Sequence, residues 1–372
     1  MPSTSDPATT AAAAAEIQTL VERTGALGRI RLNRPKALNS LTLAMVRDIE
    51  RALDDFEDDP QVAAVLVTGE GERGLCAGGD IRMIYDGGRA GSDAPATFWR
   101  EEYRMNARLA RLRKPYVAFM DGIVMGGGAG VSVHGSHRIV TERTRLAMPE
   151  TGIGFFPDVG ASWFLTRMKG ELGTYAALTG TQLLAGDAIA FGLADHCLPS
   201  AGLPALVDAL ANLPAQATRA DVSATVAALA VAPPDTAVAQ QKPAIDRLFA
   251  FDTMDEIIRA LQDDGTPFAM ETLAALQARS PLSLKVTLRL LRLGRDAPSL
   301  EACLENEFAA TAAVLKSHDF YEGVRAAVID KDRNPQWRPA RLADVTDTDV
   351  SAFFEPSVDP LFPAAPGKGE RT

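Results

Sequence analysis

The chain has 372 residues, of which 47% are hydrophobic and 23% charged, as expected of a globular protein with a sizeable buried core. Its formal net charge of −10 argues against nucleic acid as a partner. No apolar run reaches membrane-spanning length, and residues 1–15 lack a secretory or transit pattern. The cysteines are scattered without CxxC spacing, which favours a reducing compartment over a disulfide framework. We therefore predict a cytoplasmic protein with no membrane partner.

The first part of the chain alternates between predicted strands and helices. Residues 17–23 and 29–33 alternate in polarity around a glycine turn, which predicts a hairpin. A helix is expected from about residue 42, where apolar residues recur at helical spacing, followed by a buried strand over 62–68. A second helix is expected over about 95–113 and ends at the following proline.

The apolar run 116–124, predicted as a strand, leads into a glycine-rich turn at 125–130. Short strands at 138–140 and 145–147 follow, and beyond about residue 204 the pattern becomes helical. This alternation predicts an α/β fold with its loops gathered at strand ends.

We expect four parts along the chain. Residues 1–16 form a flexible N-terminal tail, and residues 17–203 form the α/β core that carries the site. Residues 204–343 form a helical region, within which the proline-containing segment 231–235 is a linker or loop. An acidic, proline-rich tail follows over 344–372.

Two glycine-rich loops are the first candidates for chemistry. Four glycines lie between Gly126 and Gly130, so another group can approach this backbone closely. If the turn opens a helix, its free N–H groups point at whatever binds there. Gly78-Gly79 follows an earlier predicted strand, and paired glycines alone more often mark a tight turn. Together, the two loops predict N–H donors that converge on one oxygen atom.

Several other motifs do not support a function. The run Gly69–Gly74 fits G-x-G-x-x-G, but no long helix opens after it and two glutamates would face a pyrophosphate. The segment 130–134 does not match a serine nucleophile elbow. Cys76 is better explained as a small buried thiol than as a nucleophile. His134 and His137 lack the glutamate of a zinc motif and are expected to be structural, so we predict no metal.

Carboxylates remain as the reactive side chains. Glu150 follows a proline in an apolar stretch, where desolvation would raise its pKa and make it a usable base or nucleophile. Asp158 is equally well explained as a helix N-cap or as a second acid. Glu101 and Glu102 lie on a predicted helix, and the residues alone do not choose between them.

Taken in order, these motifs resemble the crotonase (enoyl-CoA hydratase/isomerase) superfamily, and within it the 3-hydroxyisobutyryl-CoA hydrolase branch. The resemblance extends from about residue 17 to 343. The stretches that carry it are residues 32–39, 76–80, 98–103, 125–128, 132–135, 148–151 and 156–160. It implies a spiral of ββα turns followed by a C-terminal helical region.

The resemblance also implies roles for individual residues. The backbone N–H groups of Gly79 and Gly127 would hold the thioester carbonyl as an oxyanion hole. Glu150 matches the catalytic glutamate of the branch, and Asp158 matches its second acidic residue. Glu102 matches an acidic substrate-binding residue, which decides between the two glutamates of that helix. Glu102, Gly127, Glu150 and Asp158 would all contact the substrate.

The substrate would be an acyl-CoA, with CoA as part of the substrate and no separate cofactor. In this superfamily the CoA moiety bends over the loop after the first hairpin, which makes Arg34, Lys36 and Arg82 candidate contacts to its phosphates. Superfamily members often form trimers or hexamers through their C-terminal helices. A homo-oligomer is therefore one expectation, and a helical region folded back over its own core is the other.

One departure from the superfamily bears on the reaction. Hydratases use two glutamates to place and activate water, and the position of the first is occupied here by Gly130. Glycine carries no proton and no charge, so addition of water across a double bond loses half its apparatus. This favours attack at the thioester carbonyl, with Glu150 as nucleophile or as general base.

The first hypothesis is therefore hydrolysis of a short branched 3-hydroxyacyl-CoA, 3-hydroxyisobutyryl-CoA above all, as in valine degradation. The alternative within the fold is an enoyl-CoA isomerase or hydratase with Glu150 as a single proton carrier. A catalytically silent acyl-CoA-binding protein is the third. The hydrolase would release free thiol from a hydroxyacyl-CoA. The isomerase or hydratase would change the absorbance of an enoyl-CoA without releasing thiol, and the binding protein would do neither.

Overall fold

The computed structural model of the chain describes residues 17–362. The predicted tail at 1–16 and the last ten residues of the predicted tail at 344–372 lie outside the described residues. Within that part of the chain, no helix combines the length and the apolar character needed to cross a membrane.

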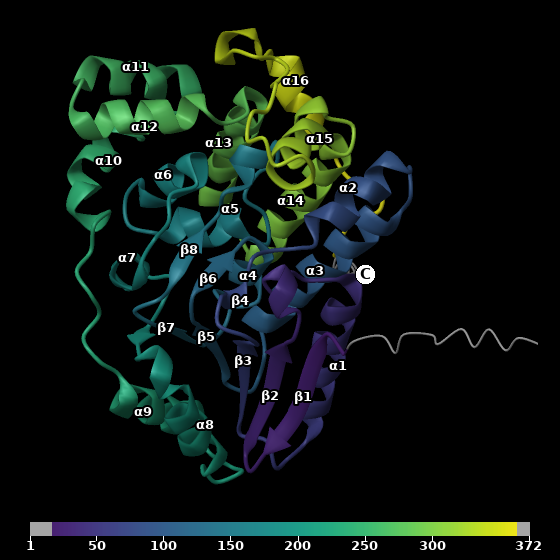
Figure 1. Cartoon of the computed structure of the whole chain (residues 1–372), viewed down its shortest axis with the longest axis vertical. Helices are drawn as coiled ribbons and strands as arrows, with labels where there is room; N and C mark the ends of the chain where they lie inside the picture. The colour runs from purple at the N-terminus through teal and green to yellow at the C-terminus, as the bar shows by residue number, and fades with distance from the viewer. Residues whose placement is uncertain (1–16, 363–372) are drawn as a thin grey trace, which may run out of the picture.

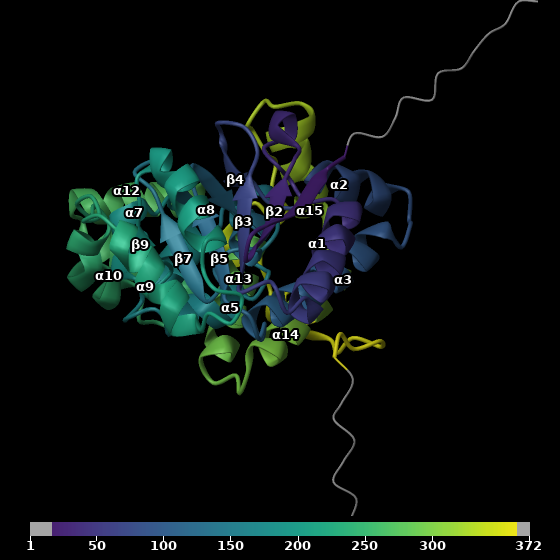
Figure 2. The ribbon, with the colours of Figure 1, turned by 90° about the horizontal axis from the view of Figure 1, so that it is seen from below.

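Two sheets form the centre of the molecule (Figures 1 and 2). The larger has strand order β1-β2-β3-β5-β7-β9, and the smaller has order β4-β6-β8. β1 and β2 pair as the predicted antiparallel hairpin, and the other ladders are parallel. The strands are β1 (Thr19–Thr24), β2 (Leu27–Leu32), β3 (Ala64–Gly69), β4 (Gly74–Cys76), β5 (Tyr116–Met120), β6 (Ile123–Met125), β7 (His137–Val140), β8 (Arg145–Ala147) and β9 (His196–Cys197).

The central strands β3 and β5 of the larger sheet are buried on both faces, which explains why their sequences are continuous apolar runs. Along β3, Val65 and Val67 point into the main core, whereas Ala64 and Leu66 point into a second, smaller core. This alternation is the two-residue period of a strand. The second core is closed by Leu206 and its neighbours on α8 (Leu203–Ala211) and α9 (Arg219–Leu229).

The helices follow the strands in a repeating pattern, with one strand in each sheet and then a helical segment. β3, β4 and α2 form one such turn, β5, β6 and α4 the next, and β7, β8 and the 3-10 turn η2 (Glu150–Ile153) a third. The predicted spiral of ββα turns is confirmed. The helices of this part are α1 (Leu43–Asp58), α2 (Ile81–Arg89), α3 (Ala94–Ala110), α4 (Gly127–Gly130), α5 (Ala161–Phe164), α6 (Leu172–Thr179) and α7 (Ala185–Ala190).

The C-terminal half is helical, as predicted. Its helices from α11 to α16 cover one end of the core, whereas α8 and α9 lie at the other end (Figure 1). α13 packs on α5 and α6, and α14 packs on α3 and α5, so the region folds back over its own chain. Its helices are α8 (Leu203–Ala211), α9 (Arg219–Leu229), α10 (Lys242–Leu248), α11 (Met254–Asp264), α12 (Pro267–Gln277), α13 (Pro281–Arg295), α14 (Leu300–Val314), α15 (His318–Val324) and α16 (Asp347–Ser351).

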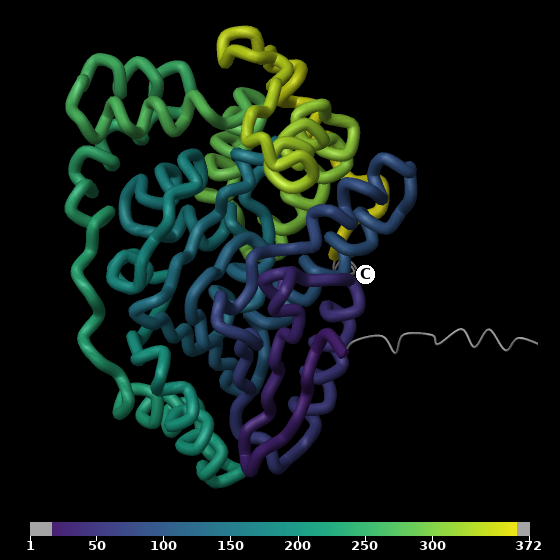
Figure 3. Tube along the Cα trace, viewed as in Figure 1, coloured from purple at the N-terminus to yellow at the C-terminus, as the bar shows by residue number. Residues whose placement is uncertain are grey.

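The C-terminal segment is more ordered than its composition predicts. Residues 344–362, expected to belong to a tail, include α16 and the 3-10 turn η8 (Ala352–Phe354), and Leu361 is buried. Glu305 on α14 accepts the N–H of Leu361 at 2.8 Å, which holds this segment against the helix. The predicted linker around 231–235 is extended and runs along the outside of the molecule from α9 to α10 (Figure 3).

Candidate active site

The small parallel sheet positions the candidate site. Gly79 follows β4, Gly127 follows β6 after one intervening residue, and Glu150 follows β8. Because β6 lies between β4 and β8, the carboxyl ends of the three strands bring these segments to one edge. Ligands of α/β proteins characteristically bind outside such strand ends.

A cavity of about 300 Å³ opens at this edge. It is lined by every residue predicted for the site, which are Gly79, Glu102, Gly127, Glu150 and Asp158. α3 supplies Glu102, and the loop between η2 and α5 supplies Asp158. The structure therefore brings the predicted residues together, and their individual roles stay predictions.

The backbone N–H groups of Gly79 and Gly127 are available to a ligand. Neither donates to an acceptor within residues 17–362. A Cβ atom placed on Gly127 would lie 2.6 Å from Oε1 of Glu102 and 3.2 Å from the nitrogen of Gly79, so the two amides are neighbours and no side chain fits between them. Two adjacent free donors are the arrangement that stabilises an oxyanion.

Three carboxyl groups share this small space without an ion-pair partner among residues 17–362. Glu150, Asp158 and Glu102 are 7%, 6% and 2% exposed. None forms an ion pair with any group in the described chain. Burial raises the pKa of Glu150 well above its usual value, and the neighbouring charge of Asp158 raises it further. Burial and Asp158 act on the pKa of Glu102 in the same direction.

Asp158 is a buried carboxyl group and does not cap a helix. Its Oδ2 accepts a hydrogen bond of 2.7 Å from the hydroxyl of Tyr103, whereas the N-cap of α5 is Gly160. Burial raises the pKa of Asp158 to about 7, although the bond from Tyr103 lowers it. Of the two interpretations left open by the sequence, the N-cap is wrong.

The surroundings of Gly130 explain why a glutamate is absent there. A Cβ atom at this position would lie 2.9 Å from Nδ2 of Asn106 and 2.9 Å from Cβ of Val159. Asn106 is fully buried, and neither of its side-chain polar atoms has a partner within residues 17–362. The space that a second carboxylate would need is therefore occupied.

One side of the cavity is apolar. The rings of Trp99 and Phe155 stack at 5.6 Å with an interplanar angle of 7°, and Phe155 stacks on Phe156 at 4.5 Å. Ile81 and Ile84 from α2 also line this wall. The cavity thus joins a wall suited to a short hydrocarbon group to a polar end made of backbone donors and acids.

The cysteine and the two histidines that we expected to be structural are buried or bonded within the fold. Burial raises the pKa of Cys76 to about 12, which keeps the thiol protonated and a poor nucleophile. His134 contacts the carbonyl of Val159 at 2.7 Å, and His137 contacts Ser223 at 2.8 Å. Within residues 17–362, no group of three or more His, Cys, Asp or Glu side chains is placed to hold a metal ion.

The choice between the two adjacent glutamates of α3 follows the helix geometry. Glu101 points outward and makes two hydrogen bonds of 2.7 Å with Arg47, whereas Glu102 faces the cavity. The rejected fingerprint at 69–74 forms a turn between β3 and β4, with no helix at its end.

The candidate CoA contacts differ from one another. The guanidinium of Arg34 pairs with Asp80 at 3.0 Å and donates to the carbonyl of Ser40 at 2.6 Å, so it holds the loop together. Lys36 and Arg82 are exposed, and neither is in an ion pair with another described residue. The two exposed cations remain the candidates for a phosphate contact.

The sequence interpretation missed residues that come from distant segments. Arg279, just after α12, lines the cavity although nothing near it in the sequence indicates a site. Tyr103 belongs to the motif at 98–103, but its contact to Asp158 depends on tertiary structure. In both cases the position of the side chain at the site depends on tertiary contacts that no local sequence pattern indicates.

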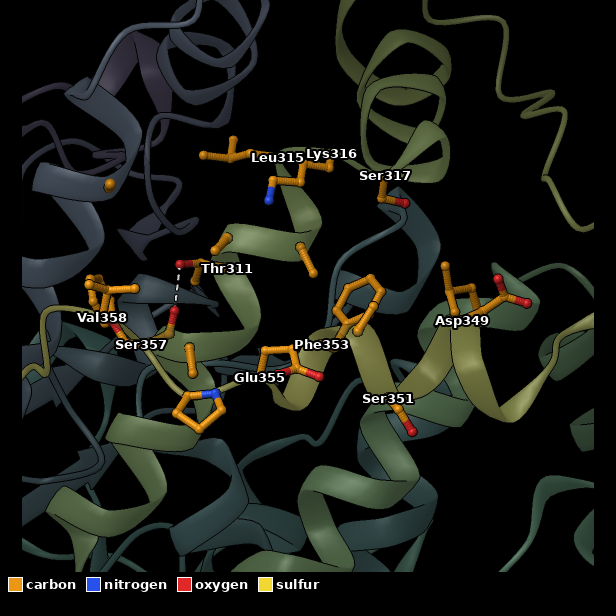
Figure 4. A pocket seen from close by; sticks show the side chains of 18 of the residues that line it. Thr311, Leu315, Lys316, Ser317, Asp349, Ser351, Phe353, Glu355, Ser357 and Val358 are labelled. Carbon is orange, nitrogen blue, oxygen red and sulfur yellow. Dashed lines mark hydrogen bonds between the residues drawn. The ribbon is translucent and has the colours of Figure 1, made fainter.

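A larger cavity lies elsewhere. It has a volume of about 1150 Å³ and lies between α14, α16 and the segment that follows, with Thr311, Phe353 and Ser357 in its lining (Figure 4). None of the predicted site residues lines it. The volume of a cavity therefore does not identify the candidate site. The site is identified by the glycine amides and buried acids that come together in the smaller cavity.

The sequence pattern of the protein family described as enoyl-CoA hydratase/isomerase matches residues 27–354. The chain belongs to this family. The family's curated relatives named 3-hydroxyisobutyryl-CoA hydrolase, mitochondrial, include the protein from Rattus norvegicus, 43% identical over 91% of this chain and 89% of that protein. The protein of that name from Homo sapiens is 42% identical over 91% of this chain and 88% of that protein.

Solved structures of the family have the same fold. The crystal structure described as a carnitinyl-CoA dehydratase from Mycobacterium thermoresistibile is 45% identical, with a TM-score of 0.87 over 93% of this chain and 98% of that one. The crystal structure described as an enoyl-CoA hydratase from Rhodobacter sphaeroides is 42% identical, with a TM-score of 0.84 over 91% and 98%. The predicted fold class is confirmed.

Proposed function

We propose that the protein hydrolyses the thioester of a short, branched 3-hydroxyacyl-CoA, with 3-hydroxyisobutyryl-CoA as the leading substrate. The products are 3-hydroxyisobutyrate and CoA, as in valine degradation. One observation carries the proposal: the free amides of Gly79 and Gly127 lie beside buried Glu150, while position 130 has no room for the second acid of a hydratase. The curated relatives with this activity in their names support it.

The oxyanion of the tetrahedral intermediate would accept hydrogen bonds from Gly79 and Gly127. These donors are fixed before the reaction by β4 and β6, so little reorganisation is needed as charge develops. Because both N–H groups are otherwise unpaired within the described chain, binding the carbonyl oxygen costs no existing hydrogen bond.

Glu150 would supply the attacking group. As a nucleophile, its carboxylate adds to the carbonyl carbon and the C–S bond breaks, which gives an anhydride and a CoA thiolate that takes up a proton. Water then cleaves the anhydride and regenerates Glu150. As a general base, Glu150 instead takes a proton from water that attacks the carbonyl directly. Asp158 and Glu102 would orient the water or the 3-hydroxyl group of the substrate.

The alternative activity, hydration or isomerisation of an enoyl-CoA, has less support. The names dehydratase and hydratase belong to the two solved relatives. In this chain the place of the first hydratase glutamate is filled by Asn106 and Val159. An assay that follows thiol release and alkene absorbance on the same samples separates the two activities.

The remaining properties follow from this activity. Thioester hydrolysis needs water and acids but no resident cofactor or metal, so we propose none, with acyl-CoA as the partner. The C-terminal helices fold back over the core, which supports the second of the two expectations, and a homo-oligomer stays a prediction. The cytoplasmic location stays a prediction too, since the names of the relatives place those proteins in mitochondria.

The proposal is tested with a panel of acyl-CoAs scored for free thiol. We expect release from 3-hydroxyisobutyryl-CoA and little from long straight chains, because the cavity is only about 300 Å³. Glu150→Gln should lower kcat by about 10²- to 10⁴-fold while substrate binding persists. Glu101→Gln is the matched control, since that glutamate pairs with Arg47 at the surface. Full thiol release by Glu150→Gln would refute the assignment.

A further inference from the structure

The loop that carries Asp158 has an unfavourable backbone conformation. Val159 has φ of 55° and the next residue, Gly160, has φ of 85°. A β-branched residue rarely adopts the left-handed region, and such a conformation persists only where the surroundings enforce it. Contacts from elsewhere in the chain must therefore hold this loop.

Glu307 makes the most extensive of these contacts. Its Oε2 accepts the N–H of Gly160 at 2.7 Å, and its Oε1 accepts the N–H and the hydroxyl of Ser162 at 2.9 and 2.5 Å. Helix α5 begins here, and its N-cap is a glycine without a side chain. Helices normally take their cap from the N-cap residue itself, whereas this cap comes from α14.

The carboxyl group of Glu307 has no ion-pair partner in the described chain. The residue is fully buried, and it pairs with no Lys, Arg or His of residues 17–362. A buried carboxylate without a cation is costly unless hydrogen bonds satisfy it. All three of its hydrogen bonds go to residues 160 and 162, beside Asp158.

Two further contacts hold the same loop from other sides. Tyr103 on α3 donates to Asp158, and His134 contacts the carbonyl of Val159 at 2.7 Å. Burial lowers the pKa of His134 to about 4, so the ring is neutral and its Nε2 carries the proton that it donates. The loop is thus fixed at Asp158, Val159 and Gly160 by three separate parts of the chain.

We propose that Glu307 is a positioning residue, whose carboxylate holds the loop 158–162 in its strained conformation and thereby aims Asp158 into the cavity. The inference rests on the proposed function in that Asp158 acts on the substrate or on water. Glu307 itself does not line the cavity, so it acts only through the loop.

The titratable groups around Asp158 decide how a change at Glu307 affects the pH dependence. Glu102 and Tyr103 from α3, Glu150 from η2 and Glu307 from α14 face Asp158, while His134 is neutral. Asp158, with a pKa raised to about 7, ionises before Glu307, whose pKa is raised to about 8 in part by the charge of Asp158. Replacing Glu307 with an amide therefore leaves the pH at which Asp158 ionises unchanged.

The test compares Glu307→Gln with a matched control on the same helix, Glu305→Gln. Glu305 also binds backbone N–H groups, but those of residues 361 and 362. We expect Glu307→Gln to lower kcat on the order of 10²-fold with little change in KM, since a misplacement of about 1 Å has that cost. Its rising pH limb should stay where it is in the wild type, because Glu307 is still protonated when Asp158 ionises. Its crystal structure should show Val159 relaxed to negative φ. Glu305→Gln should keep the kcat and pH profile of the wild type.

Ser162→Ala covers the case in which Glu307→Gln does not fold. It removes only the 2.5 Å hydroxyl bond and keeps both backbone bonds, so a smaller loss of kcat in the same direction is expected. A folded Glu307→Gln with wild-type kcat, or with φ of Val159 unchanged, would overturn the proposal. So would an unchanged kcat in Ser162→Ala if the first variant cannot be purified. If the wild type releases no thiol, the proposed function fails and the φ of Val159 alone decides the inference.

Discussion

Gly130 is the residue that separates this site from a hydratase site. We predict that Gly130→Glu creates no hydratase, because its side chain would collide with Asn106 and Val159 at 2.9 Å. Overpacking and a buried charge together should lower the free energy of unfolding by at least about 3 kcal/mol, measured by urea denaturation. Gly202→Glu is the control, since a Cβ there meets only Pro199 at 3.7 Å. Hydration of an enoyl-CoA by a stable Gly130→Glu protein would contradict this explanation.

Tyr103 tunes the acidity of Asp158. Its hydrogen bond favours the ionised form, so Tyr103→Phe should raise the pKa of Asp158 further. The rising limb of kcat/KM against pH should then move upward by about one unit, the value of one hydrogen bond to a charged group. Tyr116→Phe also loses a buried hydrogen bond, to the carbonyl of Val131, and should leave the limb in place. Equal shifts in both variants would show that the effect is not specific to Asp158.

At the scale of elements, the turn η2 links Glu150 to the C-terminal helices. It ends at Gly154, which has φ of 71° and approaches α15 so closely that a Cβ would lie 2.0 Å from the carbonyl oxygen of Asp319. A Cβ on Gly323 of α15 would likewise lie 2.3 Å from the carbonyl carbon of Ile153. The position of Glu150 therefore depends on contact with a region far along the chain.

We expect Gly154→Ala to cost about 2 kcal/mol or more of unfolding free energy and to reduce kcat, because η2 must move away from α15. Gly265→Ala is the matched control. It has a similar φ of 61°, but its nearest atom would be 3.9 Å away, so only the cost of the positive φ, about 1 kcal/mol, is expected. Equal destabilisation of the two variants would show that the contact with Asp319 is unimportant.

The elements near the site were predictable to different degrees. The hairpin, α1 and α3 follow from periodicity, and each has the predicted type and place. α2 was not predicted, because Gly87 and Gly88 lie within it and glycine disfavours helix. The glycine turn at 126–130 was expected to open a helix, and α4 extends only over Gly127–Gly130.

The residues of the site were also predictable to different degrees. Gly79, Gly127 and Glu150 each follow a strand of one small sheet, so local motifs were sufficient to find them. The alternatives for Asp158 could not be resolved locally, because its partner Tyr103 lies 55 residues earlier. Glu307 had no local signal at all, since its contacts lie at Gly160 and Ser162, almost 150 residues earlier. Long-range polar contacts are the part that a single sequence does not reveal.

At the scale of the whole molecule, the buried acids should make stability depend on pH. Glu102, Glu150, Asp158 and Glu307 all have pKa values raised by burial, those of the last two to about 7 and about 8. A folded pKa above the unfolded value stabilises the fold at low pH, and this contribution is lost as the pH rises through the folded value.

We therefore predict that Tm falls by several degrees between about pH 5 and about pH 9, in a thermal-denaturation series at constant ionic strength. Glu307→Gln should show a shallower slope, because one titrating group is removed. A Tm that stays level or rises across this range would contradict the assignment of raised pKa values to these acids.

The outer connection between α9 and α10 has a consequence for how the protein can be divided. It is exposed over 231–235, yet Val231 donates to the carbonyl of Cys197 at 2.8 Å, and Val238 donates to Asp187 at 3.1 Å. A break between those anchors would yield one fragment with every acid of the cavity and another with Glu307. Neither fragment would hold a finished site, so two separately expressed halves would regain thioesterase activity only on reassembly, and that activity would report their association.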